Sequence, residues 1–154
     1  MFVEEELLLD APFPAARRRL AALLQEGWLS AASGEAYADG HTALIRVGPF
    51  GDVPGTSGLV RVRFMEPAPQ GDAVILPLRW EAEGATGRLL PVLDADIALR
   101  PSGEQTRLVI SGSYRPPLDG FGARLDKLAL SPVATATVKS LVRRIGRELA
   151  SPAA

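Results

Sequence analysis

Cysteine is absent from this sequence of 154 residues, and histidine occurs only once. Disulfides, thiol chemistry and cysteine-rich zinc sites are therefore excluded. No apolar run approaches the roughly 18–20 residues that span a bilayer. The 17 Lys and Arg residues nearly balance the 18 Asp and Glu residues, and no block of five or six like charges occurs. We therefore expect no nucleic-acid partner, no polybasic membrane tether and no stable membrane insertion.

The chain does contain enough apolar material for one folded domain. Hydrophobic residues make up 47% of it, which argues against disorder. Its length suits a single domain, and neither a repeat nor a linker divides it, so we predict one domain over residues 1–154. The N-terminus is acidic, with Glu4 to Glu6, where a secretory signal would be basic. We therefore expect a soluble, cytoplasmic protein.

Hydrophobic periodicity divides the chain into strands and helices. The run Phe2–Leu9 is the first strand candidate, although its three consecutive leucines also suit a helix. Apolar patterning predicts further strands at Thr42–Val47, Leu59–Met65, Ala73–Glu83, Leu90–Arg100 and Thr106–Tyr114. An alternative extends the first of these back to Glu35. Helical spacing predicts helices over Pro14–Gln25, from Trp28 onward, and from about Asp119 to Ala150.

Prolines and glycines mark the breaks between these elements. Residues 66–72 and 101–104 are predicted turns. Pro77 should shift its strand toward a sheet edge or a bulge. Pro132 either kinks the last helix or restarts it behind a Ser131 cap. Four or more strands joined by short turns indicate an antiparallel meander.

The order of these elements resembles the helix-grip fold of the START/Bet v 1-like superfamily. The stretches most similar to that superfamily are Leu78–Ala82, Leu93–Ile97 and Gly112–Pro117. That superfamily includes polyketide cyclase-like (SRPBCC) and lipid-transfer branches, and the chain is similar to its uncharacterised bacterial members. The resemblance implies an α+β fold in which a curved antiparallel β-sheet wraps around a long C-terminal helix. One or two short helices would follow the first strand, and a ligand cavity would lie between sheet and helix. No catalytic motif is implied, because the superfamily has no universal one.

Strand parity predicts which residues face that helix. Val74, Leu76, Leu78 and Trp80 alternate with Ile75, Pro77 and Arg79, so the apolar set should point inward. The charged residues Arg61, Arg63, Arg79 and Glu81 all fall on the opposite side, which favours an apolar ligand over a charged one. We predict that the ligand-binding residues are Leu78, Trp80, Ile110, Tyr114, Phe121 and Leu125. Trp80 and Tyr114 also suit plain core positions.

Three other features invite a functional interpretation. Asp94 and Asp96 share one strand face, but it is the face away from the apolar residues, so cross-strand pairing with Arg79 or Arg107 is expected. His41 is a lone histidine without further metal ligands, so no metal and no cofactor are predicted. The Gly- and Pro-rich segment 48–58 lacks the dinucleotide-binding pattern and suits a long hairpin loop or a gate near the cavity. Gly112 marks either a bulge or a close approach to the backbone.

These observations favour non-covalent binding of a small or medium hydrophobic molecule, such as a lipid, an isoprenoid or a polyketide-like compound. An alternative is a cyclase or aromatase acting on a polyketide-like substrate, with Tyr114 and His41 as candidate proton donors. A third possibility is an interaction module whose core is completely filled. The catalytic residues of any enzyme and the oligomeric state are left open.

Overall fold

The computed structural model of the chain describes residues 2–33, 35–36, 60–82, 92–115 and 126–151. Residues 28–33 and 35–36 are helical, in agreement with the predicted second helix. The alternative that the next strand begins at Glu35 is therefore wrong. The predicted strand Thr42–Val47 and the segment 48–58 lie outside the described residues. The other elements are β1 (Phe2–Leu9), α1 (Phe13–Gln25), β2 (Val60–Phe64), β3 (Ala68–Gln70), β4 (Ala73–Ala82), β5 (Val92–Ser102), β6 (Gln105–Arg115) and α3 (Asp126–Ala150).

The strands form one antiparallel sheet of six strands, in the order β1-β6-β5-β4-β2, with β3 also paired to β4. Gly71 and Gly103 are the first residues of two tight turns, and their φ angles are 63° and 62°. Glycine is favoured at such positive φ angles because it has no Cβ. The prediction that residues 66–72 form only a turn is wrong, because β3 occupies part of that segment and pairs with the start of β4.

Pro77 lies in an interior strand rather than at an edge. β4 pairs with β5 on one side and with β2 and β3 on the other. The Pro77 carbonyl accepts a hydrogen bond of 2.9 Å from the Met65 backbone N–H, so it points toward the β2 and β3 side. In an antiparallel strand the N–H and the C=O of one residue point the same way. A residue with an N–H at this position would direct it toward the gap between β2 and β3. The interruption that the sequence predicted for β4 therefore occurs between β2 and β3, and β4 itself is continuous.

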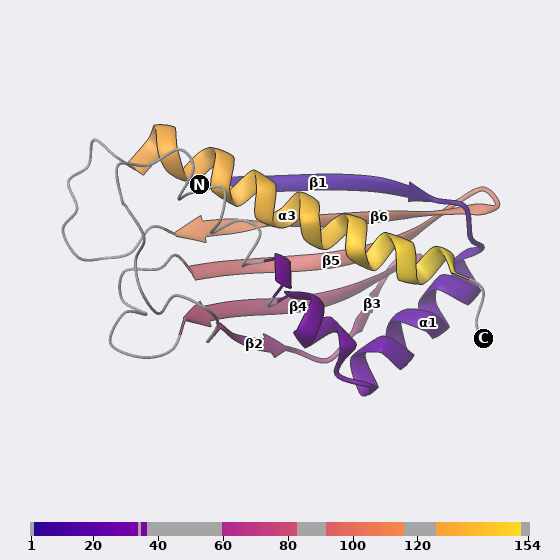
Figure 1. Ribbon diagram of the computed structural model, residues 1–154. Helices are drawn as coiled ribbons and strands as arrows, with labels where there is room; N and C mark the ends of the chain where they lie inside the picture. Colours follow the sequence, from indigo (N-terminus) through magenta and orange to yellow (C-terminus); the bar gives the residue numbers. More distant parts are fainter. Residues whose placement is uncertain (1, 34, 37–59, 83–91, 116–125, 152–154) are drawn as a thin grey trace.

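α1 and α3 cover the same face of the sheet (Figure 1). α3 contacts β1 and β6, while α1 contacts β5, β6 and α3. We call the face toward the helices the inner face and the opposite one the outer face. α3 is continuous from Asp126 to Ala150, so it passes through Pro132 without a break. Residues 119–125 of the predicted helix lie outside the described part of the chain.

The hydrophobic core lies between the inner face and the helices. On α3 the buried residues are those of the predicted stripe: Val138, Leu141, Val142, Ile145 and Leu149. On α1 they are Ala16, Leu20 and Leu23, with Leu24 packed at the margin. Strand parity is confirmed on β4, where Val74, Leu76, Leu78 and Trp80 are at most 7% exposed. The sequence therefore specifies which side of each of these elements is buried.

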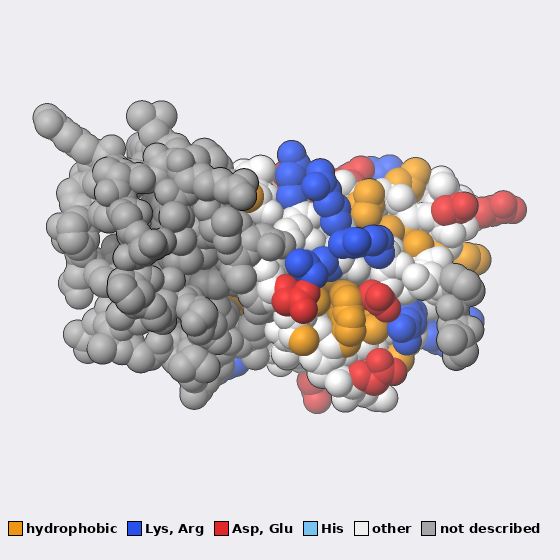
Figure 2. All heavy atoms as spheres, viewed as in Figure 1, with side chains coloured by type: hydrophobic (Ala, Val, Ile, Leu, Met, Phe, Trp, Pro, Cys, Tyr) orange, Lys and Arg blue, Asp and Glu red, His pale blue; other side chains and the backbone are white. Residues whose placement is uncertain are grey.

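Charge is distributed unevenly between the two layers. The helical segments 13–33, 35–36 and 126–151 contain eight Lys and Arg residues but four Asp and Glu residues. The sheet with its turns, residues 2–10, 60–82 and 92–115, contains six Arg residues and ten Asp and Glu residues. Figure 2 shows basic side chains gathered over the face that carries α3. The nearly neutral chain thus has a positive helical layer and a negative sheet layer.

Candidate functional site

The register of the sheet arranges the inner-face residues in rows across the strands. Trp80 of β4 lies opposite Leu93 of β5, and Leu93 lies opposite Tyr114 of β6. Two residues along, Leu78 lies opposite Ala95, which lies opposite Gly112. The next row is Leu76, Ile97 and Ile110. The middle row therefore carries much smaller side chains on β5 and β6 than the rows on either side.

Ala95 and Gly112 are held very close together. A Cβ built on Gly112 would lie 2.6 Å from the Ala95 Cβ and 2.3 Å from the Asp94 carbonyl oxygen. Cβ atoms of opposite residues in an antiparallel pair are normally about 4.5–5.5 Å apart. The register through Gly112 is unbroken, so the residue marks a close backbone approach and not a bulge. β5 and β6 therefore approach unusually closely at this row, where their inner face carries only a methyl group and a hydrogen. Ala95 is 7% exposed and belongs to the core cluster.

The predicted ligand-binding residues are only partly within the described chain. Leu78, Trp80 and Ile110 lie on the inner face, are 1–2% exposed and belong to one core cluster. The backbone of Tyr114 lies in β6 opposite Leu93, and its side chain is outside the described part. Phe121, Leu125 and His41 also lie outside the described residues. The assignment of all six to a ligand site stays a prediction.

The outward position of the paired aspartates is confirmed. Asp96 is exposed, and Asp94 forms an ion pair of 3.3 Å with Arg79, its cross-strand neighbour. Arg107 pairs instead with Glu6 of β1 at 3.2 Å, so the predicted partnership with the aspartates holds only for Arg79. These carboxylates are on the outer face and cannot act on a ligand held at the inner one.

Glu5 of β1 is a charged residue on the inner face, and it was not identified from the sequence. Val3 and Leu9 are buried and Leu7 is half-buried, so the alternate residues of β1 face the helices, and Glu5 is among them. It lies opposite Ile110 and is half-buried. The three consecutive leucines hid this parity, although Val3, Leu7 and Leu9 taken alone would have shown it. The inner face thus has one carboxylate at its β1 margin.

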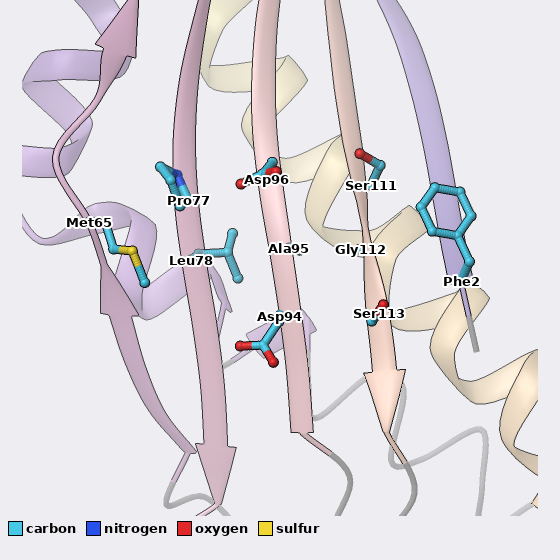
Figure 3. Close-up of a pocket in the computed structure, with 10 residues that line it drawn as sticks. All are labelled: Phe2, Met65, Pro77, Leu78, Asp94, Ala95, Asp96, Ser111, Gly112 and Ser113. Carbon is cyan, nitrogen blue, oxygen red and sulfur yellow. The ribbon is translucent and has the colours of Figure 1, made fainter.

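A groove of about 660 Å³ lies on the outer face of the sheet. Figure 3 shows the residues that line it: Phe2 of β1, Met65 after β2, Pro77 and Leu78 of β4, Asp94, Ala95 and Asp96 of β5, and Ser111, Gly112 and Ser113 of β6. Phe2 and Met65 at its two ends are 68% and 58% exposed, so the groove is open to solvent. Neither a histidine nor a cysteine lines it, and no group of three or more potential metal ligands occurs among the described residues. It offers a shallow surface of mixed polar and apolar residues and not an enclosed site.

One buried hydrogen bond and two partly exposed ion pairs join the elements around the core. The Thr106 hydroxyl donates a hydrogen bond of 2.8 Å to the Ala11 carbonyl and joins β6 to the segment before α1. Arg19 on α1 pairs with Glu148 on α3 at 3.2 Å, and Arg144 on α3 pairs with Glu35. These contacts fasten the short helices to α3. Within the described residues, no helix is both long and apolar enough to cross a membrane.

Comparison with known proteins supports the fold and goes no further. No protein-family model and no curated protein matches the chain. A structure of the hypothetical protein jhp0584 from Helicobacter pylori is 12% identical, covers 96% of this chain and 86% of its own, and has a TM-score of 0.53. TTHA0849 from Thermus thermophilus is 18% identical over 97% of both chains, with a TM-score of 0.45. The Zhui aromatase/cyclase from a Streptomyces species is 13% identical over 97% and 88%, with a TM-score of 0.32. The last two TM-scores are too low to support an inference. The element order and the sheet topology confirm the predicted helix-grip arrangement as a fold.

Proposed function

We propose that this chain is a START/Bet v 1-like protein that binds a small or medium hydrophobic molecule between the inner face of the sheet and α3. The observation that carries the proposal is the row of Leu78, Ala95 and Gly112. There the inner face of the sheet loses side-chain volume between rows of large apolar residues. A lipid, an isoprenoid or a polyketide-like compound has the chemistry to fill such a recess.

Apolar burial would supply most of the affinity. Each Å² of apolar surface removed from water contributes roughly 25 cal/mol before the costs of binding. Leu76, Leu78 and Ile110 offer no hydrogen-bonding side-chain atom, so they favour hydrocarbon over polar ligands. Glu5 at the β1 margin is the only charged strand residue on the described inner face, and it would suit a hydroxyl or amine at one end of the ligand.

The cyclase alternative has no supporting observation among the described residues. Its two candidate proton donors, His41 and Tyr114, have side chains outside them. The filled-core alternative differs from ligand binding in one prediction. It predicts that the protein's own side chains fill the space over Ala95. Ligand binding and a filled core therefore predict opposite results for apolar probes.

Native mass spectrometry of freshly purified protein, with solvent extraction of the same sample, tests the proposal. We expect a stoichiometric added mass that disappears on denaturation and an apolar compound in the extract. A titration with Nile red, a neutral apolar dye, accompanies it, and saturable one-to-one binding to delipidated protein is expected. A bare protein mass together with no saturable binding of Nile red would overturn the proposal in favour of a filled core.

A further inference from the structure

The exposed side of α3 carries a stripe of three basic residues, Lys139, Arg143 and Arg147. They are spaced four residues apart, so they lie on one side of the helix, and all three are exposed. The buried residues Val138, Val142 and Ile145 lie on the other side. At 1.5 Å per residue the stripe is about 12 Å long. We call these three residues the basic stripe.

Nearby carboxylates do not neutralise the basic stripe. Among the described residues of the helical layer, Glu35 is paired with Arg144, and Glu148 is paired with Arg19. No described carboxylate pairs with a residue of the stripe. Arg17 and Arg18 of α1 are also exposed, so the whole layer presents a positive potential toward solvent.

We propose that the helical layer docks electrostatically on an anionic lipid surface through the basic stripe. The docking is peripheral, because the stripe has no apolar residue that could insert. The large hydrophobic residues with high exposure in the described chain are Phe2, Leu8 and Met65, and all belong to the sheet layer. The negative sheet layer would then face away from the bilayer.

The composition of this surface favours a lipid headgroup region over a protein partner. Protein interfaces draw most of their binding energy from aromatic and apolar anchors seated in pockets. The stripe has flexible cationic side chains on a convex helix, which suits a flat layer of phosphates. Single-stranded nucleic acid would need exposed aromatic side chains for stacking, and the described helical layer has none with high exposure.

Vesicle binding by the full chain tests this proposal. We would measure co-sedimentation with vesicles of phosphatidylcholine alone and with vesicles containing about one third phosphatidylglycerol. The account predicts binding to the anionic vesicles only, and loss of that binding in about 1 M salt, where the Debye length falls to about 3 Å. Each basic residue near an anionic surface contributes about a fivefold factor to partitioning.

Two matched variants separate the stripe from net charge. The double variant Arg143→Gln/Arg147→Gln should lower partitioning about 10- to 30-fold. The control Arg63→Gln/Arg100→Gln removes the same charge from exposed positions of the sheet layer and should leave partitioning nearly unchanged. Thermal melts confirm that both variants fold. The proposal is independent of the proposed ligand, whose binding is read by Nile red without vesicles.

Three results would overturn the proposal. The first is an absence of binding to anionic vesicles at low salt. The second is equal loss of binding in the two double variants, which would indicate a net-charge effect without a defined surface. The third is tighter binding to duplex or single-stranded nucleic acid than to anionic vesicles at equal phosphate concentration, which would identify a nucleic-acid surface.

Discussion

Gly112 lies directly opposite Ala95, and the space between them has no room for a second Cβ. Such a Cβ would also lie 2.3 Å from the Asp94 carbonyl oxygen, which belongs to the backbone of the neighbouring strand. A flexible side chain could move aside, whereas a backbone carbonyl within the ladder cannot move without disturbing its hydrogen bonds. The close approach of β5 and β6 at this row therefore depends on glycine.

Gly112→Ala should destabilise the protein by about 1–3 kcal/mol, as overpacked core positions usually do. Urea unfolding followed by circular dichroism measures this loss. The control Ser113→Ala, at the exposed next residue, should change the stability by less than about 0.5 kcal/mol. Adding Ala95→Gly should rescue Gly112→Ala only in part, because the contact with the Asp94 carbonyl remains. Full stability of Gly112→Ala would contradict the close approach.

Gly146→Ala should be tolerated better than Gly112→Ala. A Cβ on Gly146 of α3 would meet the end of the Leu7 side chain of β1, at 2.4 Å from its Cδ2. That methyl group can move by rotation, and alanine is favoured over glycine in a helix by about 1 kcal/mol. We therefore expect a net change of less than about 1 kcal/mol in thermal unfolding. Leu7→Ala removes the side chain that would clash with the new Cβ. The double variant Leu7→Ala/Gly146→Ala should therefore be more stable than Leu7→Ala alone.

Thr106→Val should cost about 1–3 kcal/mol although its shape is preserved. The valine cannot donate to the Ala11 carbonyl, and that buried acceptor would lose its partner. Thr106→Ser keeps the hydroxyl and should retain more of the stability. Equal losses in the two variants would show that packing of the threonine methyl group, and not the hydrogen bond, stabilises this contact.

The Arg79 and Asp94 pair should contribute little to stability. Their side chains are 37% and 38% exposed, and exposed pairs are usually worth about 0.2–1 kcal/mol. A double-mutant cycle with Arg79→Gln and Asp94→Asn should give a coupling energy in this range, and it should shrink in high salt. Neither change should affect binding of an apolar probe, because both residues are on the outer face. A loss of probe binding in Asp94→Asn would contradict that placement.

Much of the fold could be predicted because burial follows periodicity. The apolar residues of β4, β6 and α3 alternate or recur as strand and helix geometry requires, so both the elements and their buried sides were evident. Local pattern could not place Pro77, since its missing N–H is accommodated by a gap in the adjacent strands β2 and β3. It also could not show β3, whose three residues are all exposed.

The candidate site was less predictable because it depends on register. The sequence marks Gly112 as a bulge or a close approach, but only strand pairing shows that Ala95 is the residue opposite it. Glu5 was hidden by the leucine run that follows it. The basic stripe escaped a search for runs of like charge, although the spacing of four residues between Lys139, Arg143 and Arg147 on a predicted helix would have shown it. Properties that arise between elements are set by tertiary contacts and not by local pattern.

Nile red binding to the variant Ala95→Leu tests most directly the central claim that an apolar ligand binds at the inner face. The larger side chain should fill the proposed recess over the row of Leu78, Ala95 and Gly112, so Nile red binding should fall at least tenfold while the melting temperature stays the same or rises. Ser113→Leu adds similar bulk on the outer face and should leave Nile red binding intact. A contradictory result would be unchanged dye binding in Ala95→Leu, or a stability loss of about 1–3 kcal/mol, which would show that the protein's own side chains already fill that space.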